Sequence, residues 1–192
     1  ANGTIDFNNK TLTGASGITV AGGSPTLANT GGTTFNANAL NITHNGGTLT
    51  LATNLTTTGA YTLSTGTVSL ATYILTVTSL SSNNSNTRAI NFGTSGQIAL
   101  TGNNATILDF TTATNFTYSN TPYINSTYTG ATGTRTFNFG GTAGATASNT
   151  FSVATSGTSG IVIGTSATDT FALTGSFNNI NLTGITNTLS NK

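Results

Sequence analysis

The sequence predicts an all-β protein, organised as a β-solenoid-like stack of short strands. Two matching heptads carry this prediction, Gly47–Thr53 (GTLTLAT) and Gly66–Thr72 (GTVSLAT). In each of them Leu or Val occupies every second position, with a hydroxyl residue between, which is typical of a strand with one buried face. The interval from Gly47 to Gly66 is enough for a strand, a turn, a second strand and a turn back. A return to the same pattern after that interval favours a coil stacked on its predecessor.

Composition supports a folded β protein. Only 4% of the residues are charged, against roughly 25% in an ordinary globular domain. Disordered chains usually combine low hydrophobicity with charge and proline, whereas this chain has 2 prolines and regularly spaced Val, Ile, Leu and Phe. Glu is absent, and no stretch carries the 3.6-residue period of an amphipathic helix.

The same composition excludes several partners. A formal net charge of +1 with four Lys and Arg residues cannot neutralise many phosphates, so no nucleic-acid partner is expected. No apolar run approaches the ~20 residues of a membrane helix, so no membrane insertion is expected. Cys is absent, which excludes disulfides. Met is absent as well, so we expect the chain from Ala1 to be a processed product or a segment of a longer polypeptide.

In the first half of the chain, apolar residues separated by two positions alternate with turn signals. The main turn signals are 21–25, the pair Gly31-Gly32 and Asn45-Gly46-Gly47. Besides the two heptads, short strands are expected around Ile5, Leu12, Ile18–Val20, Leu27, Phe35, Leu40–Ile42, Leu55, Tyr61–Leu63 and Ile74–Leu80.

A change of repeat suggests two regions, 1–82 as a short-repeat β-solenoid-like region and 83–192 as a second β module. The polar stretch Ser79–Asn86 separates them. Beyond it, Thr87–Gly93 (TRAINFG) matches Thr134–Gly140 (TRTFNFG), which defines a 47-residue repeat, and Ile98–Gly102 is echoed by Phe171–Gly175. Spacing alone leaves two possibilities for this half, a wider-coil module or a β-sandwich.

The chain offers few groups for chemistry, and no catalytic, cofactor-binding or metal-binding residue is expected. A pair of carboxylates of the kind glycosidases use would have to come from Asp109 and Asp169. Like Asp6, both have Thr close by in the sequence, where turn capping is the commoner role. His44, next to Asn45-Gly46, is expected to be a solvated turn residue, and no cluster has metal-ligand spacing. We therefore expect a protein that is not an enzyme.

Arg88 and Arg135 occupy matching positions of the 47-residue repeat. One interpretation is contact with a ligand or partner. The other, which we favour, is that each guanidinium group binds turn carbonyls or an Asp, because its five donors can satisfy otherwise open acceptors.

Thr-x-Thr pairs at Thr11/Thr13, Thr48/Thr50 and Thr76/Thr78 suggest a further alternative. Ladders of such pairs allow β-solenoid ice-binding proteins to order water. The second heptad converts Thr48/Thr50 into Thr67/Ser69, so the lattice is imperfect and ice binding is the less favoured alternative.

The motifs of the second half resemble a known group of proteins. Thr87–Gly93, Gln97–Asn103 and Gly133–Thr136 are similar to segments of Gly/Thr/Asn-rich repetitive fibre and virion structural proteins of marine bacteriophages, over about residues 47–142. The resemblance implies an extended β appendage on a virus particle, located at the virion surface, and carries over no catalytic residue.

The expected partners are further copies of the chain, other virion proteins and glycans of the host surface, with no cofactor. The main alternative is a bacterial cell-surface adhesin or filament subunit, which would follow the same fold logic.

Overall fold

The computed structural model contains strands and no helix among the residues it describes. These are 2–6, 8–13, 17–32, 34–38, 40–103, 106–112, 114–119, 123–128, 134–138, 150–155, 160–164, 170–175, 180–183 and 189–191. For Thr13, 34–38, Thr134 and the segments from 150 on, only the backbone is described. Every strand pairing is parallel. The expected all-β class and the β-solenoid are confirmed.

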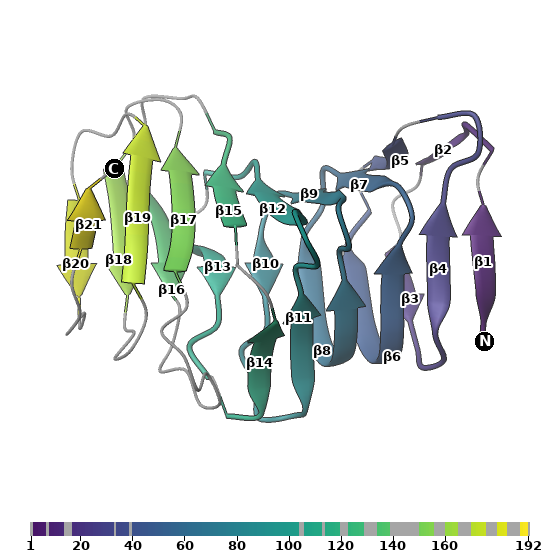
Figure 1. The fold of residues 1–192 in the computed structure, drawn as a ribbon, viewed down its shortest axis with the longest axis horizontal. Helices are drawn as coiled ribbons and strands as arrows, with labels where there is room; N and C mark the ends of the chain where they lie inside the picture. The colour runs from purple at the N-terminus through teal and green to yellow at the C-terminus, as the bar shows by residue number, and fades with distance from the viewer. Residues whose placement is uncertain are drawn as a thin grey trace.

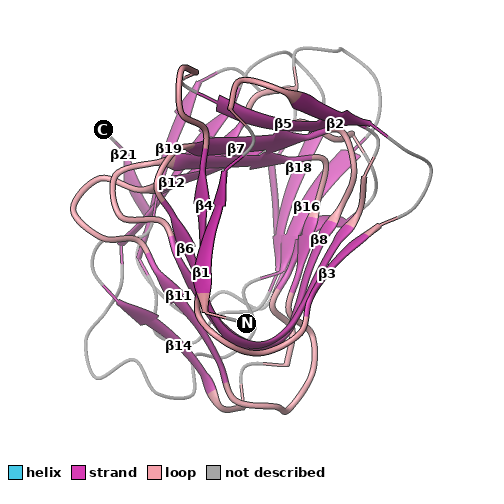
Figure 2. Cartoon of the chain, turned by 90° about the vertical axis from the view of Figure 1, so that its right-hand side faces the viewer, coloured by secondary structure: helices cyan, strands magenta, loops and turns pink. Residues whose placement is uncertain are grey.

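The strands stack in three columns around the long axis, with the two chain ends at opposite ends of the stack (Figure 1). Viewed along that axis, the columns form three walls (Figure 2). The first column contains β1 (Gly3–Asp6), β4 (Pro25–Ala28), the second halves of β6 (Ile42–Leu51) and β8 (Tyr61–Ser69), β11 (Arg88–Asn91) and β14 (Phe116–Ser119). The second contains β2 (Thr11–Thr13), β5 (Thr34–Asn38), β7 (Asn54–Thr57), β9 (Ile74–Val77), β12 (Gln97–Leu100), β15 (Tyr123–Ser126), β17 (Thr150–Thr155), β19 (Thr170–Gly175) and β21 (Leu189–Asn191). The third contains β3 (Ile18–Val20), the first halves of β6 and β8, β10 (Leu80–Ser81), β13 (Thr106–Asp109), β16 (Thr134–Asn138), β18 (Gly160–Gly164) and β20 (Ile180–Thr183).

The two heptads stack directly on each other. Thr48 pairs with Thr67, Leu49 with Val68 and Thr50 with Ser69. The apolar members are fully buried, whereas the hydroxyl residues between them, Thr48, Thr50, Thr67 and Ser69, are partly exposed. The prediction that these segments form successive coils is therefore confirmed.

The path of the chain between the heptads differs from the expected strand, turn and strand. A coil holds three short strand segments instead of two, because β6 and β8 bend from the third wall to the first without leaving the sheet. The bend in β6 falls at Asn45-Gly46-Gly47, where the pairing register with β8 shifts. Gly46 and Gly47 have φ values of 116° and 70°, which glycine adopts readily. The expected turn is thus a corner within one strand.

A single column of apolar side chains fills the interior. Alternate residues point inward along each strand, so inward positions of successive coils stack on one another. The fully buried members of this core include Leu49, Leu55, Leu63, Val68, Leu70, Leu75, Val77, Ile90, Ile98, Leu100, Ile107, Leu108, Phe110, Ile124 and Phe137.

Coil length changes along the stack, as three register pairs show. The number of residues between a strand position and its partner on the next coil measures coil length. It is smaller from Leu55 to Leu75 than from Arg88 to Phe116, and it is smallest of the three from Phe171 to Leu189. Because all of these pairs are parallel, the second half of the chain consists of coils, some of them wider, and not of a β-sandwich. The division expected at residues 82/83 falls between β10 and β11, and the sheets continue across it through β8–β11 and β10–β13.

Candidate functional site

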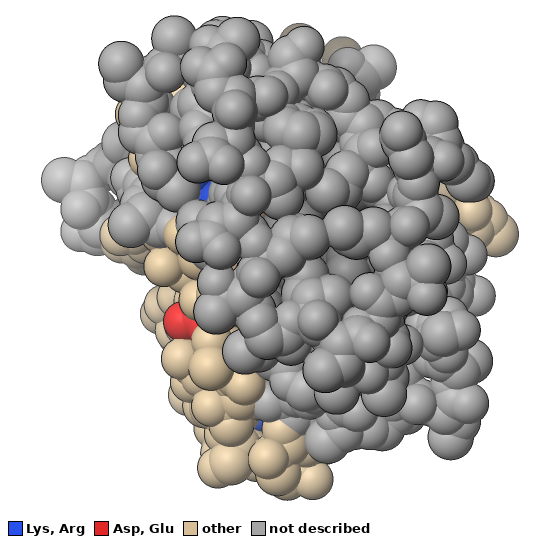
Figure 3. Space-filling model, turned by 90° about the vertical axis from the view of Figure 1, so that its left-hand side faces the viewer, with Lys and Arg blue, Asp and Glu red and all other residues tan. Residues whose placement is uncertain are grey.

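Charged and titratable side chains are rare along the described part of the solenoid. No group of three or more His, Asp or Glu side chains that could hold a metal ion occurs there. The described residues also contain no helix that is long and apolar enough to cross a membrane. Most of the described surface on the side shown in Figure 3 belongs to uncharged residues. The groups able to take part in chemistry are therefore the few that the coils hold inside or at their corners.

The two described aspartates cap corners of the coils. The Asp6 carboxylate accepts hydrogen bonds from the backbone N–H groups of Asn8 and Thr30, both at 2.9 Å, and from the Thr30 hydroxyl. These bonds, with the Thr30 hydroxyl first, lower the pKa of Asp6. Asp109 accepts bonds from the backbone and hydroxyl of Thr111 and from the Asn83 side-chain amide. The expected capping role is confirmed for Asp6 and Asp109, while Asp169 lies outside the described residues, so the pair Asp109/Asp169 is not placed.

Arg88 is a buried cation whose donors are all used. The side chain is 1% exposed. Nε donates to the Ser82 hydroxyl at 2.8 Å, Nη1 donates to the carbonyls of Asn86 and Thr114, and Nη2 donates to the carbonyls of Ser82 and Thr112. A guanidinium group has five N–H donors, so none remains for a ligand. The preferred interpretation, binding of turn carbonyls, is confirmed for Arg88.

Arg88 also packs against an aromatic cluster of the next coil. Its Cζ atom lies 4.9 Å from the centroid of the Phe116 ring, which is its register partner on β14. Phe116 in turn contacts Phe110 and Tyr118 with ring centroids 4.8 and 4.7 Å apart. Burial lowers the pKa of Arg88, but a guanidinium group stays charged in proteins, and the ring faces favour that charge.

Arg135 is fully buried in a comparable setting. Nη1 donates to the Ser126 hydroxyl at 2.8 Å and contacts the Tyr128 carbonyl, and Cζ lies 5.9 Å from the Tyr128 ring centroid. The two arginines do not occupy equivalent positions of the coil, however. Arg88 lies on β11 in the first column and Arg135 on β16 in the third. The matching sequence positions therefore fall on different columns, because the interval between them does not span a whole number of coils.

His44 is buried and not a solvated turn residue, so that expectation is wrong. Its side chain points inward from β6, between Val20 of β3 and Leu63 of β8 in the register. Nε2 lies 3.0 Å from the Gly46 carbonyl and Nδ1 lies 3.0 Å from the Tyr61 hydroxyl. Because a carbonyl only accepts, Nε2 carries the proton, Nδ1 accepts, and Tyr61 donates. Burial raises the pKa of Tyr61, which keeps this phenol protonated.

The sequence held a signal for this buried pair. Ile42 and His44 follow the same alternation as the inward residues of the neighbouring strands, and Tyr61 and Leu63 repeat it one coil later. The Asn-Gly-Gly motif obscured it, because we expected that motif to reverse the chain and expose its neighbours.

Asparagine side chains join successive coils at the corners. Asn41 Oδ1 accepts from the backbone N–H of Ala60, and Asn54 Oδ1 from that of Ile74, each at 2.9 Å. Asn83 Oδ1 accepts from both the backbone and the hydroxyl of Thr112. In each case the partner lies about one coil further along the chain. These bonds satisfy backbone groups where the ladder is interrupted.

Comparison of the chain with protein-family models, curated proteins and solved structures found no match. The function is therefore inferred from the geometry. That geometry consists of corner caps, the buried Arg88 with all its donors used, the buried Arg135 and a buried His–Tyr pair, arranged along a continuous solenoid.

The His44–Tyr61 pair makes stability depend on pH. Burial lowers the pKa of His44 below its usual 6.5, against the opposing effect of the hydrogen bonds to Gly46 and Gly47. The unfolded chain therefore binds a proton more readily than the folded one as the pH falls below about 6.5. We expect the free energy of unfolding to be constant above that pH and to fall below it, by at most about 1.4 kcal/mol per pH unit for one proton.

Urea unfolding between pH 8 and 5 measures this dependence. His44 is the only His, and Cys and Glu are absent, so His44→Gln should remove the dependence in this window. The lowered pKa of Asp6 acts at lower pH, below its usual 3.8, because its stabilisation is present above that value and lost as the pH falls. A wild-type slope that persists in His44→Gln would show that another group is responsible.

Proposed function

We propose that the chain is a non-enzymatic structural subunit, a β-solenoid segment of a phage fibre or of a capsid or tail decoration. The observation that carries the proposal is the continuous stack of parallel coils, with the two ends of the chain at opposite ends (Figure 1). Parallel coils form hydrogen bonds with the backbone groups of their neighbours. The stack therefore keeps its shape without a large core.

The way in which polar groups are used supports this proposal. All five N–H donors of Arg88 form hydrogen bonds within the chain, and Asp6 and Asp109 cap corners of the coils. A catalytic group has to be available to a substrate, whereas these groups are committed to holding coils together. Outward positions carry mainly Thr, Asn and Ser, which keep the surface hydrated despite the few charges.

The assignment to a virus particle rests on the resemblance of Thr87–Gly93 and Gln97–Asn103 to phage appendage proteins. The surface of a bacterial cell is the alternative location. Immunogold electron microscopy with an antibody against the 192-residue chain, applied to purified particles and to uninfected cells, distinguishes the two. We expect label on particles at a regular position. Label on uninfected cells alone would overturn the phage location and favour the adhesin.

Ice binding is a second candidate, and one observation favours it. Thr4, Thr26, Thr50 and Ser69 stand in register on four neighbouring strands of the first wall, about 4.8 Å apart from strand to strand. The column continues with Asn91, which interrupts the hydroxyl array. Thermal hysteresis of a concentrated solution tests this candidate, and its absence would exclude ice binding.

A further inference from the structure

Glycine follows asparagine at two places in the sequence, Asn2-Gly3 and Asn45-Gly46. Asparagine is a chemically labile residue, because its side-chain amide can be attacked by the peptide nitrogen of the residue that follows. Glycine has no Cβ atom and restricts the backbone least, so it hinders this attack less than any other residue does. The structure places the two Asn-Gly steps in different surroundings.

The Asn45 side chain is exposed and does not join coils. At other corners the asparagine amide is held: Asn41 Oδ1 accepts from the backbone N–H of Ala60 in the next coil. Asn2 Oδ1 likewise accepts from the backbone N–H of Ser24 at 2.9 Å. The Asn45 amide makes no hydrogen bond to any residue that the structure describes. It can therefore turn toward its own backbone at no cost in hydrogen bonds.

The peptide group between Asn45 and Gly46 lies where the β-ladder is interrupted. The register with β8 shifts on both sides of Asn45, and Gly46 and Gly47 have no partner in it. On the other side of β6, the pairs with β3 end at His44 and the pairs with β4 begin at Thr50. Gly46 has a φ of 116°, far from that of an extended strand. The Gly46 nitrogen is thus outside the register that fixes the backbone of regular strands.

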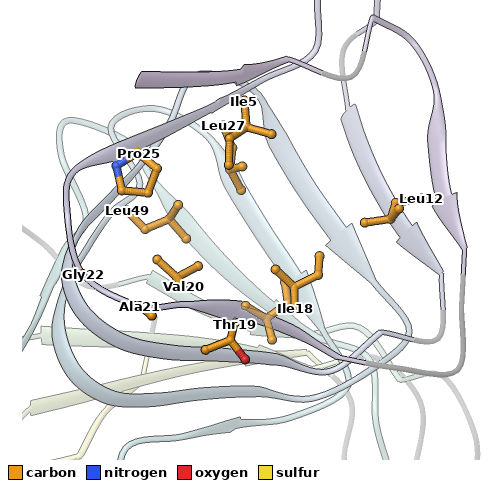
Figure 4. Close-up of a pocket in the computed structure, with 11 residues that line it drawn as sticks. Ile5, Leu12, Ile18, Thr19, Val20, Ala21, Gly22, Pro25, Leu27 and Leu49 are labelled. Atoms are coloured by element: carbon orange, nitrogen blue, oxygen red, sulfur yellow. The ribbon is translucent and has the colours of Figure 1, made fainter. Parts of the chain in front are cut away.

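The preceding coil leaves this corner accessible. In Figure 4 its chain bends at Gly22, between Val20 of the third wall and Pro25 of the first. Gly22 is the neighbour of Gly46 across the coils, since a Cβ atom added to Gly46 would lie 3.4 Å from the Gly22 nitrogen. Because Gly22 has no side chain, the neighbouring coil contributes only backbone atoms there. Gly46 remains partly exposed, so water reaches the peptide group.

We propose that Asn45 is a site of spontaneous deamidation, in which the Gly46 nitrogen attacks the Asn45 side-chain amide. A bond forms between this nitrogen and Asn45 Cγ, the Cγ–Nδ2 bond breaks, and the proton of the peptide nitrogen leaves with Nδ2 as ammonia. The product is a cyclic succinimide. Water then opens the ring at either of its carbonyl carbons, which gives aspartate or isoaspartate. Water is the only co-reactant, and nothing is oxidised or reduced.

The modification would alter the solenoid at a sensitive place. The formal net charge is +1, so one further carboxylate brings it to zero, and a net charge near zero promotes association. Isoaspartate also lengthens the main chain of β6 by one methylene group, directly before the corner at Gly47. The backbone of Gly47 is closely stacked between Gly23 and Gly66 of the neighbouring coils. The inference goes beyond the proposed structural role and does not depend on it.

Incubation of the folded 192-residue chain in mildly alkaline buffer, followed by peptide mass mapping, tests the proposal. We expect the Asn45 peptide to be converted to aspartate and isoaspartate forms, with release of ammonia. Asn45→Gln should lose this conversion, because glutamine would have to form a larger ring. Asn45 is exposed, so the variant should fold, and urea unfolding checks that it does.

Asn2 is the internal control. In the urea-unfolded chain both Asn-Gly steps should react at similar rates, because neither is held by the fold. Folding should slow the reaction at Asn2, whose amide is bonded to Ser24, and leave Asn45 reactive. An Asn45 that reacts in urea but stays intact in the folded chain would overturn the proposal. So would an Asn2 that reacts as fast as Asn45 in the folded chain.

Discussion

Gly47→Ala is expected to be among the most destabilising single substitutions in the described chain. Gly47 forms the corner of β6 and has a φ of 70°, where a residue with a side chain is strained by roughly 1–2 kcal/mol. A Cβ atom added there would overlap the Gly23 carbonyl oxygen of the preceding coil. The coils would have to separate at this corner, and overpacking of this kind typically costs about 1–3 kcal/mol more. We expect a loss of about 2–5 kcal/mol in the free energy of unfolding, measured by urea denaturation.

Gly22→Ala is the matched control. Gly22 has nearly the same φ, 76°, but an added Cβ atom there would meet nothing within 4 Å. It should therefore show the conformational cost alone, about 1–2 kcal/mol. Equal effects of the two substitutions would mean that close stacking of the corners contributes nothing and that only the backbone angle matters.

The stacking of the first coils could be predicted from the sequence because its signals are local and repeated. Alternation at Leu49, Leu51, Val68 and Leu70 fixes which residues point inward, and the spacing of the two heptads equals one coil. Both signals remain visible although the chain bends, because the face of a strand that points into the core before a bend between two walls also points into the core after it.

The paths of the corners could not be predicted in the same way. Glycine allows a chain reversal and a bend within a strand equally well, and the sequence around Gly46 does not distinguish them. That choice decided whether His44 lay in solvent or in the core, so the His44–Tyr61 pair was missed for this reason.

The variable coil length made the structure of the second half of the chain harder to predict from the sequence. Arg88 and Arg135 lie in matching seven-residue motifs. A similar sequence does not determine where a residue lies within a coil when the loops between strands vary in length. Arg88 stacks on Phe116 of β14, and not on a residue of the matching motif. The role of the arginine was nevertheless predictable from its chemistry, because long corners leave carbonyl groups that need donors.

Arg88→Met is expected to reduce the free energy of unfolding by about 3–5 kcal/mol. The substitution keeps an unbranched apolar chain but removes five donors. The acceptors left behind are Ser82 and Asn86, which precede β11, and Thr112 and Thr114, which precede β14. Urea unfolding measures the loss. Lys10→Met removes the same charge at an exposed position and should change stability by less than about 0.5 kcal/mol.

Arg88→Lys separates charge from geometry. A lysine at this position keeps the positive charge but has three donors on one atom, whereas the arginine fork reaches acceptors on both loops. We expect Arg88→Lys to lose most of the stability that Arg88→Met loses. Recovery of wild-type stability with lysine would mean that the charge near Phe116 matters more than the hydrogen bonds.

The same substitutions decide between the two roles considered for Arg88. An arginine kept for a partner would leave the isolated protein about as stable when removed, because its donors would be free in the absence of that partner. A buried guanidinium group with five intramolecular hydrogen bonds predicts the opposite, a large loss in the isolated chain. The position of Arg88 gives it a particular role, because its acceptors lie in the segments that precede β11 and β14. One side chain that binds both segments therefore ties two successive coils together.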